Sequence, residues 1–189
     1  MKLAAREMVM RRLVVSNHIT LDGFFEGTNR EIDWFIRDQE TVEYSQDLLR
    51  SVDIILFGRV TYELMAGYWP SAAPDEVAQK MNSLPKVVFS RTLGNVHWNN
   101  CTLVREDVAE EIARLKQQPG KDMVILGSGV LTSFLVPLGL IDEYRLLLNP
   151  VLLGSGNPLF HGIKERVRLK LRETRTLSSG LVVLYYEKS

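Results

Sequence analysis

The sequence predicts an α/β protein whose sheet is parallel in the middle and is closed by an antiparallel hairpin. Three short, mostly apolar segments, at residues 54–57, 85–92 and 122–126, have the composition of strands buried on both faces of a sheet. Two of them end at a glycine and lead into a segment that can continue as a helix. Near the end of the chain, two further strand patterns flank a Ser-Ser-Gly turn, which is typical of a hairpin.

The first predicted strand, residues 13–20, is followed by a sharp turn at residues 21–24. Asp22 belongs to a turn-forming Asp-Gly pair, and it also places a carboxylate at a strand end, where catalytic groups are often found. It is therefore either a catalytic candidate or a turn former that caps its own backbone. His18 lies within the strand and has no second histidine at metal-ligand spacing, so we expect a core or cleft residue and no metal site.

Two adjacent aromatic residues, Trp34 and Phe35, follow a polar loop at residues 26–33. They could form the wall of a site for a flat ligand, although packing beneath the loop is the simpler explanation. Residues 40–51 then have the apolar spacing of an amphipathic helix.

The central junction of the chain is the point where the apolar run 54–57 ends at Gly58 and a helix begins. Such a junction brings free backbone N–H groups and the positive end of a helix dipole together, and so favours an anion. Arg59 adds a charge and Thr61 a hydroxyl, both suited to phosphate oxygens. The alternative is an ordinary strand-to-helix turn with a surface arginine.

A similar set of groups follows the second buried strand. The strand ends in Ser90-Arg91-Thr92, so Ser90 and Arg91 stand at its carboxyl end, the edge where ligands bind in open α/β sheets.

The segments around that strand are predicted from weaker patterns. Residues 74–82 indicate a short helix, and residues 96–104 a weaker strand. Asp107 and Glu110 resemble a capping pair at the start of another helix, which Pro119-Gly120 would end.

The third buried strand, residues 122–126, repeats the strand–glycine–helix order with Gly127, Ser128 and Gly129. Thr132 stands where a dinucleotide-binding fingerprint would have its third glycine, so this motif alone is weakly specific. Two such junctions in one small domain could together hold the two ends of a dinucleotide.

The last third of the chain reads as strands. Residues 143–148 lead into a glycine-rich loop, residues 166–172 alternate basic and apolar side chains, and residues 181–187 form a final strand. The alternation predicts an antiparallel strand with one buried face. Neither Gly-Ser-Gly triplet fits a serine-hydrolase nucleophile elbow.

Composition narrows the class of protein. The chain has 189 residues, 46% of them hydrophobic, and its 23 basic and 23 acidic residues cancel. This balance argues against nucleic acid or a membrane as the main partner. Cys101, the one cysteine, cannot form an intrachain disulfide. With no signal-peptide core or membrane-spanning run, we expect a soluble, cytoplasmic protein, with residues 1–10 as a disordered extension and 11–189 as a single domain.

Taken together, these motifs resemble the dihydrofolate reductase-like superfamily. More narrowly, the chain is similar to stand-alone relatives of the reductase domain of the bifunctional riboflavin-biosynthesis deaminase-reductase. The resemblance runs from Arg11 to Lys188. The residues that carry it are Leu21-Asp22-Gly23, Phe57 to Glu63, Val88-Phe89-Ser90, Ile125 to Gly129 and Ile141-Asp142-Glu143.

The resemblance implies a three-layer α/β/α fold around a mixed, mostly parallel sheet, a homodimer, and an NADPH-dependent reductase. The loop from Asp22 to Gly27 would lie across the nicotinamide. The implied cofactor residues are Gly58, Arg59 and Thr61 at the phosphates, Ser90 and Arg91 at the adenosine ribose and its 2′-phosphate, and Gly127, Ser128, Gly129, Val130 and Leu131 at the pyrophosphate. The folate-binding arginine and the acidic residue of true dihydrofolate reductases have no identifiable counterparts.

The sequence thus favours hydride transfer from NADPH to a small heterocyclic substrate, pterin- or pyrimidine-like, or to a carbonyl group. Asp22 is the candidate proton relay, and Trp34 and Phe35 are the candidate substrate wall. The alternative from another class is a non-catalytic nucleotide-binding module with the same fold.

Overall fold

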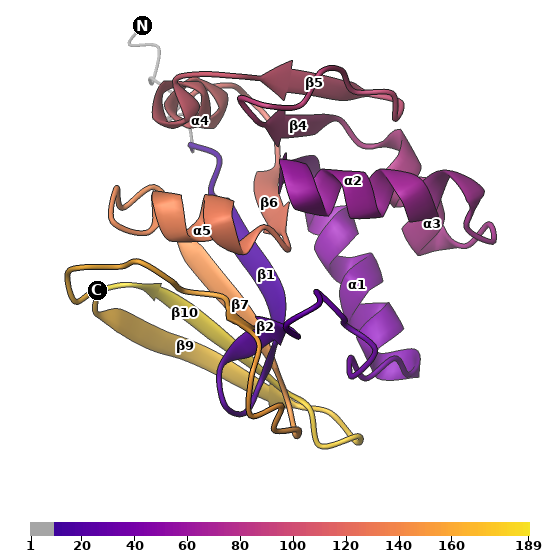
Figure 1. Ribbon diagram of the computed structural model, residues 1–189, viewed down its shortest axis with the longest axis vertical. Helices are drawn as coiled ribbons and strands as arrows, with labels where there is room; N and C mark the ends of the chain where they lie inside the picture. Colours follow the sequence, from indigo (N-terminus) through magenta and orange to yellow (C-terminus); the bar gives the residue numbers. More distant parts are fainter. Residues whose placement is uncertain (1–9) are drawn as a thin grey trace, which may run out of the picture.

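An eight-stranded sheet runs through the centre of the computed structural model, which describes residues 10–189 (Figure 1). Its strand order is β5-β4-β3-β6-β1-β7-β10-β9, and β2 and β8 pair separately. In chain order the strands are β1 (Leu13–Thr20), β2 (Phe24–Glu26), β3 (Val52–Gly58), β4 (Lys86–Phe89), β5 (Cys101–Val104), β6 (Asp122–Leu126), β7 (Glu143–Asn149), β8 (Asn157–Pro158), β9 (Leu169–Thr176) and β10 (Val182–Lys188). The predicted disordered extension, apart from Met10, lies outside the described residues.

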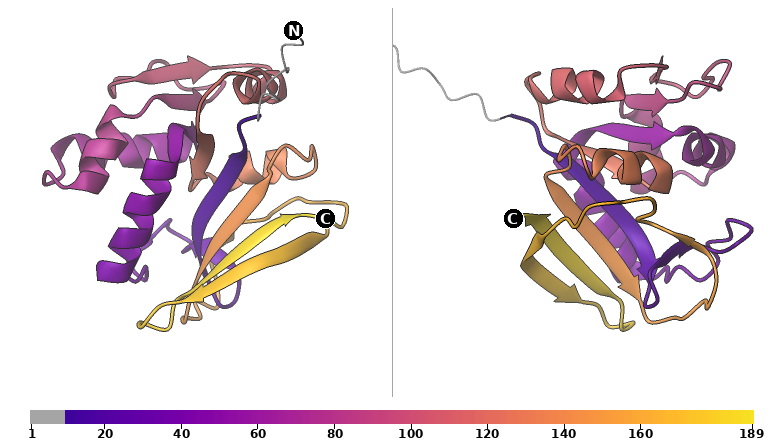
Figure 2. Two further views of the ribbon diagram at one scale, coloured as in Figure 1. Left: turned by 180° about the vertical axis from the view of Figure 1, so that it is seen from behind. Right: turned by 60° about the vertical axis from the view of Figure 1, so that its left-hand side comes forward.

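The sheet is parallel over six strands and antiparallel at one end, which confirms the predicted arrangement. Strands β5, β4, β3, β6, β1 and β7 are mutually parallel, whereas β10 is antiparallel to both of its neighbours, β7 and β9. The hairpin formed by β9 and β10 lies at the edge of the sheet farthest from β5 (Figure 2).

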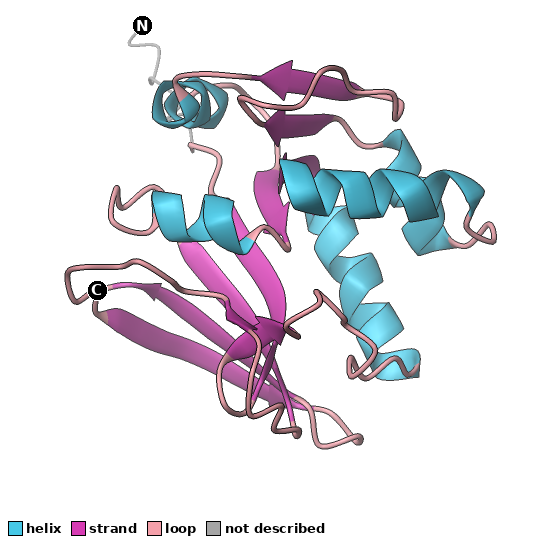
Figure 3. Ribbon diagram, viewed as in Figure 1, coloured by secondary structure: helices cyan, strands magenta, loops and turns pink. Residues whose placement is uncertain are grey.

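Helices cover the sheet on two faces, as the three-layer prediction requires (Figure 3). One apolar core joins the sheet to α1 (Gln39–Ser51), α2 (Arg59–Tyr68) and α3 (Glu76–Ser83). A second core joins the opposite face to α4 (Val108–Lys116) and α5 (Gly129–Leu135). A short 3₁₀ turn, Trp69–Ser71, follows α2. Among residues 10–189, no helix has both the length and the apolarity needed to cross a membrane.

The alternation of β1 shows how one strand serves both cores. Val14 packs in the core under α1, α2 and α3, whereas Leu13 and Val15 pack in the core under α4 and α5. All three are fully buried, as expected for a strand in the middle of a covered parallel sheet. Side chains further along β1 therefore alternate between the two faces as well.

The order of the strands creates a topological switch point between β3 and β6. These strands are parallel neighbours, but the chain leaves β3 into α2 on one face and leaves β6 into α5 on the other. In Figure 1, α2 and α5 accordingly lie on either side of β6. In open α/β sheets, the crevice at such a point, outside the carboxyl ends of the strands, is where ligands bind.

One local prediction is wrong and another is confirmed only in part. Asp107 precedes α4, but its backbone is left-handed (φ 53°) and its side chain makes no capping hydrogen bond, so the predicted capping pair with Glu110 does not form. The strand predicted at 166–172 begins at Leu169, as β9, and its apolar face is buried only in part: Val167 and Leu169 pack against the second core, whereas Leu171 is 48% exposed. As the edge strand, β9 has a neighbour on one side only.

Candidate functional site

The two glycine junctions meet at the switch point and hold each other through reciprocal hydrogen bonds. The Gly58 N–H donates to Ser128 Oγ at 2.7 Å, and the Ser128 N–H donates to Thr61 Oγ1 at 2.8 Å. Each junction thus supplies a hydroxyl that accepts a backbone N–H of the other. The bends that follow β3 and β6 are therefore fixed side by side.

The second junction is further fixed by a side chain from β1. Asn17 accepts a hydrogen bond from the Gly127 N–H at 2.7 Å and donates one to the Gly127 carbonyl at 3.3 Å. Gly127 itself has a φ of 66°, and a Cβ at this position would lie 2.8 Å from Cγ2 of Thr61. Both the left-handed backbone and the lack of space require glycine here.

The starts of α2 and α5 carry no side-chain cap, unlike those of two other helices. Asp38 caps α1 and Asp75 caps α3, each through its carboxylate. By contrast, Gly58 has no side chain to offer α2, and Ser128 makes no capping bond to α5. The first-turn N–H groups of α2 are consequently available to an external anion at the switch point.

Arg59 and Arg91 flank this position with exposed positive charge. Arg59 is the first residue of α2 and pairs with Glu63 one turn along, at 3.0 Å. Arg91 follows β4 and is exposed. Its neighbour Ser90 accepts hydrogen bonds from the backbone N–H groups of residues 92 and 93, so this hydroxyl orders the loop.

The remaining predicted cofactor residues divide between core and surface. Leu131 is buried in the core beneath α5, whereas Val130 is 73% exposed. Gly129 is covered by a ring from the β2 segment: a Cβ at this glycine would lie 2.8 Å from Cε1 of Phe25. Thus only the backbone of Leu131 can face the crevice, and Phe25 closes over the start of α5.

Asp22 anchors a loop. Its carboxylate accepts hydrogen bonds from the Thr20 hydroxyl at 2.6 Å and from the backbone N–H groups of Leu153 and Gly154, at 3.2 Å and 2.8 Å. The bond from Thr20, followed by those two backbone bonds, lowers the pKa of Asp22. These contacts hold a carboxylate ionised, which favours the turn-forming alternative over a proton relay.

Trp34 and Phe35 gather with His18 into one aromatic cluster. The Phe35 ring stacks on the imidazole of His18 at a centroid distance of 4.3 Å, and Trp34 meets Phe35 edge-on at 4.5 Å. All three side chains are partly buried. The two predicted aromatic residues therefore pack beneath their loop and also bring a histidine to the carboxyl end of β1.

Asn149 is a site residue that sequence reasoning missed. Its fully buried amide accepts from the Ile36 N–H at 3.1 Å and donates to the Leu147 carbonyl at 2.9 Å and toward His18 Nδ1 at 3.1 Å. It thereby ties the end of β7 to β1 and to the loop of the aromatic cluster. The only signal in the sequence was a polar residue at the end of a predicted strand.

Burial governs the charge of the histidine. Removal from water lowers the pKa of His18 to about 4, and the positive charge of Arg37 acts in the same direction. The imidazole is therefore neutral at pH 7.

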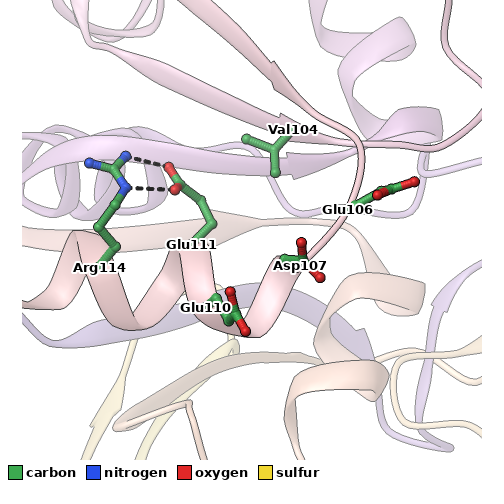
Figure 4. A pocket seen from close by; sticks show the side chains of 6 residues that line it. All are labelled: Val104, Glu106, Asp107, Glu110, Glu111 and Arg114. Atoms are coloured by element: carbon green, nitrogen blue, oxygen red, sulfur yellow. Dashed lines mark hydrogen bonds and ion pairs between the residues drawn. The ribbon is translucent and has the colours of Figure 1, made fainter.

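A separate hollow lies away from the two junctions, between the end of β5 and α4 (Figure 4). It has a volume of about 330 Å³. Its lining residues are Val104, Glu106, Asp107, Glu110, Glu111 and Arg114. The one arginine pairs with Glu111 at 2.6 Å, so the net charge is negative and disfavours a phosphate.

We predict that Gly127→Ala destabilises the protein by about 2 kcal/mol or more, because alanine is strained at positive φ and its methyl group would displace Thr61. Gly67→Ala is the matched control: Gly67 lies within α2 with open space around it, so alanine should stabilise by about 0.5–1 kcal/mol. Urea unfolding of both variants measures these changes. Equal effects of the two substitutions would contradict the assigned role of the Gly127 bend.

We also predict that His18 makes stability depend on pH. Because the pKa is about 4 in the folded state and 6.5 in an unfolded chain, the unfolded state binds the proton more readily between these values. Stability should fall as the pH is lowered from about 6.5 to about 4, by up to on the order of 3 kcal/mol. Urea unfolding across this range, compared with His18→Gln, isolates the effect. Identical pH profiles for the two proteins would show that the histidine is not held neutral.

Comparison with known proteins places these features in a family. Residues 11–183 match the family described as RibD C-terminal domain. The uncharacterized protein YyaP of Bacillus subtilis is 41% identical over 180 residues, which cover 93% of this chain and 94% of that protein. The crystal structure of a putative riboflavin biosynthesis protein from Shewanella sp. PV-4 superposes with a TM-score of 0.76 at 23% identity, covering 94% of this chain and 99% of that one.

Dihydrofolate reductase from Enterococcus faecalis, solved in complex with NADP(H), has the same fold. It superposes with a TM-score of 0.65 at 13% identity, covering 94% of this chain and 96% of that chain. The predicted dihydrofolate reductase-like fold is therefore confirmed. The family match over nearly the whole chain shows that the protein belongs to the RibD C-terminal domain family.

Proposed function

We propose that the protein is an NADPH-dependent reductase that transfers a hydride to a small heterocyclic substrate, pterin- or pyrimidine-like, or to a carbonyl group. The observation that carries this proposal is the meeting of two glycine junctions at the switch point between β3 and β6, with helix starts that lack side-chain caps. Membership of a reductase family supports it.

The residues at the switch point fit a dinucleotide. The uncapped start of α2 and the bend at Gly127 would receive its diphosphate, since both present backbone close to the crevice. Arg91, past the end of β4, would face the adenosine and its 2′-phosphate on one side of the crevice. Arg59 would add charge to the phosphates, in exchange for its present pairing with Glu63.

The other side of the crevice belongs to β1 and β7, which follow β6 in the sheet. The nicotinamide end would extend in this direction, toward the aromatic cluster of His18, Trp34 and Phe35. The bound cofactor supplies the hydride; the chain binds it, orients the substrate and keeps water out. Phe25, which packs on Gly129, would help to cover the reacting groups.

A second candidate function is a nucleotide-binding module without catalysis. The contacts of Asp22 favour it, because they occupy this carboxylate and lower its pKa, so the chain offers no proton relay at that position. Such a module would bind NADPH without consuming it in the presence of pterins, pyrimidines and carbonyl compounds. Absorbance of NADPH in a panel of these compounds separates the two functions.

We predict that NADPH stabilises the protein more than NADH does, and that the difference shrinks in Arg59→Ala and Arg91→Ala, which remove positive charge beside the phosphates. At 100 times its Kd, NADPH should add about 2.7 kcal/mol of stability. Thermal-shift titrations measure this, with Arg114→Ala in the acidic hollow as the control. Equal shifts for the two cofactors would refute the 2′-phosphate assignment, and no shift for either would refute the proposed function.

We predict that Asp22→Asn lowers thermal stability and leaves turnover unchanged. The amide keeps the shape of the carboxylate but accepts the Leu153 and Gly154 N–H groups more weakly, because charge-assisted hydrogen bonds are stronger than neutral ones. Melting temperature and steady-state NADPH oxidation, with whichever substrate of the panel is reduced, are compared with the unmodified protein. A large loss of kcat without a loss of stability would instead make Asp22 a catalytic residue.

A further inference from the structure

The aromatic cluster holds His18 in one tautomer. The orientation of the Asn149 amide is fixed, because its oxygen accepts the Ile36 N–H and its nitrogen faces the carbonyls of β1 and β7. This nitrogen also faces His18 Nδ1 at 3.1 Å. Because the amide nitrogen bears hydrogens and cannot accept, a proton on Nδ1 would face a donor; the proton of the neutral ring therefore lies on Nε2.

Two N–H donors of the cluster have no acceptor within the described part of the chain. None of the hydrogen bonds among residues 10–189 uses Nε2 of His18, whose side chain is partly exposed. The indole Nε1 of Trp34 is buried and also has no partner. A buried donor without an acceptor is uncommon in proteins and requires an explanation.

In the proposed orientation of the cofactor, the cluster would lie on the side of the crevice where the substrate meets the nicotinamide. His18 follows Asn17, the residue that holds the bend at Gly127. As neighbours on β1, the two side chains point to opposite faces of the sheet, Asn17 toward the Gly127 bend and His18 toward Phe35. The imidazole is thus one strand away from the second glycine junction, on the side opposite to Arg91.

The charges around the cluster favour electron-rich groups. Arg37 is close enough to act on the imidazole. The neighbouring carboxylate of Asp38 accepts the Thr41 N–H at 2.8 Å and so serves as the cap of α1. Asp33 is exposed. Neither of these carboxylates accepts a hydrogen bond from the His18 or Trp34 side chain, whose N–H groups are therefore left to a neutral or electron-rich acceptor.

We infer that His18 and Trp34 determine substrate specificity by donating hydrogen bonds to acceptor atoms, ring carbonyl oxygens or imine nitrogens, on one edge of a planar heterocycle. This inference rests on the proposed function and adds to it the polarity of the substrate edge. Asn149 is fully buried and acts indirectly, by holding the imidazole and the loop at Ile36 in place. A heterocycle with amino groups on this edge would place its N–H donors against those of His18 and Trp34, and would bind more weakly.

The test uses two probes with one ring system and opposite edges, lumazine (2,4-dioxopteridine) and 2,4-diaminopteridine. Isothermal titration calorimetry measures the Kd of each for the protein with and without saturating NADPH. The inference predicts that lumazine binds at least tenfold more tightly. His18→Phe and Trp34→Phe keep an aromatic ring and remove the N–H, so each should reduce this preference to less than threefold. His97→Gln, in which the replaced side chain is exposed and outside the cluster, should leave it unchanged.

Equal or tighter binding of the diamino probe, or a preference that survives in both phenylalanine variants, overturns the inference. Absence of binding by either probe overturns it too. The calorimetric titrations without NADPH require neither cofactor binding nor turnover. A failure of the proposed cofactor is detected separately, as the absence of a thermal shift with NADPH. Circular dichroism of the two variants checks that lost preference reflects a folded protein.

Discussion

The arrangement of the candidate site depends on the exchange of hydroxyl groups between the two glycine junctions. Ser128 accepts the N–H of Gly58, and Thr61 accepts the N–H of Ser128. These bonds join the β3–α2 turn to the β6–α5 turn. The two turns lead to opposite faces of the sheet and are far apart in the chain, so the covalent backbone alone does not hold them together. In both bonds the hydroxyl oxygen is the acceptor, so each O–H can still donate to an anion at this point, beside the backbone N–H groups and the arginine side chains.

Much of the fold could be predicted because it is encoded locally. The apolar run at residues 54–57 and the glycines at 58 and 127 mark the strand ends, and the structure places these strands side by side. The first strand was predicted with the bounds it has, Leu13–Thr20. Local signals failed where a neighbour decides the outcome. Leu171 has the alternation of a half-buried strand, but it lies on the edge strand and is exposed, whereas Leu169 of the same strand packs against the second core.

The site was predicted less completely, because its hydrogen bonds join residues far apart in the chain. Asn149 contacts His18 across 131 residues, and Asp22 contacts Gly154 across 132. These contacts arise from the parallel pairing of β1 with β7, in which Thr20 lies opposite Asn149. No spacing rule in the sequence fixes that register. The two aromatic residues were noticed, whereas the histidine and the amide that complete their cluster could be recognised only after the strands were paired.

The small sheet of β2 and β8 has a mechanical consequence. Phe24 pairs with Pro158, Glu26 pairs with Asn157, and the Asn157 side chain donates to the carboxylate of Glu26 at 2.7 Å. Two segments more than 130 residues apart in the chain are thus held together as one small sheet. A movement of the β2 backbone, which carries Phe25 on the start of α5, therefore displaces the β8 segment as well.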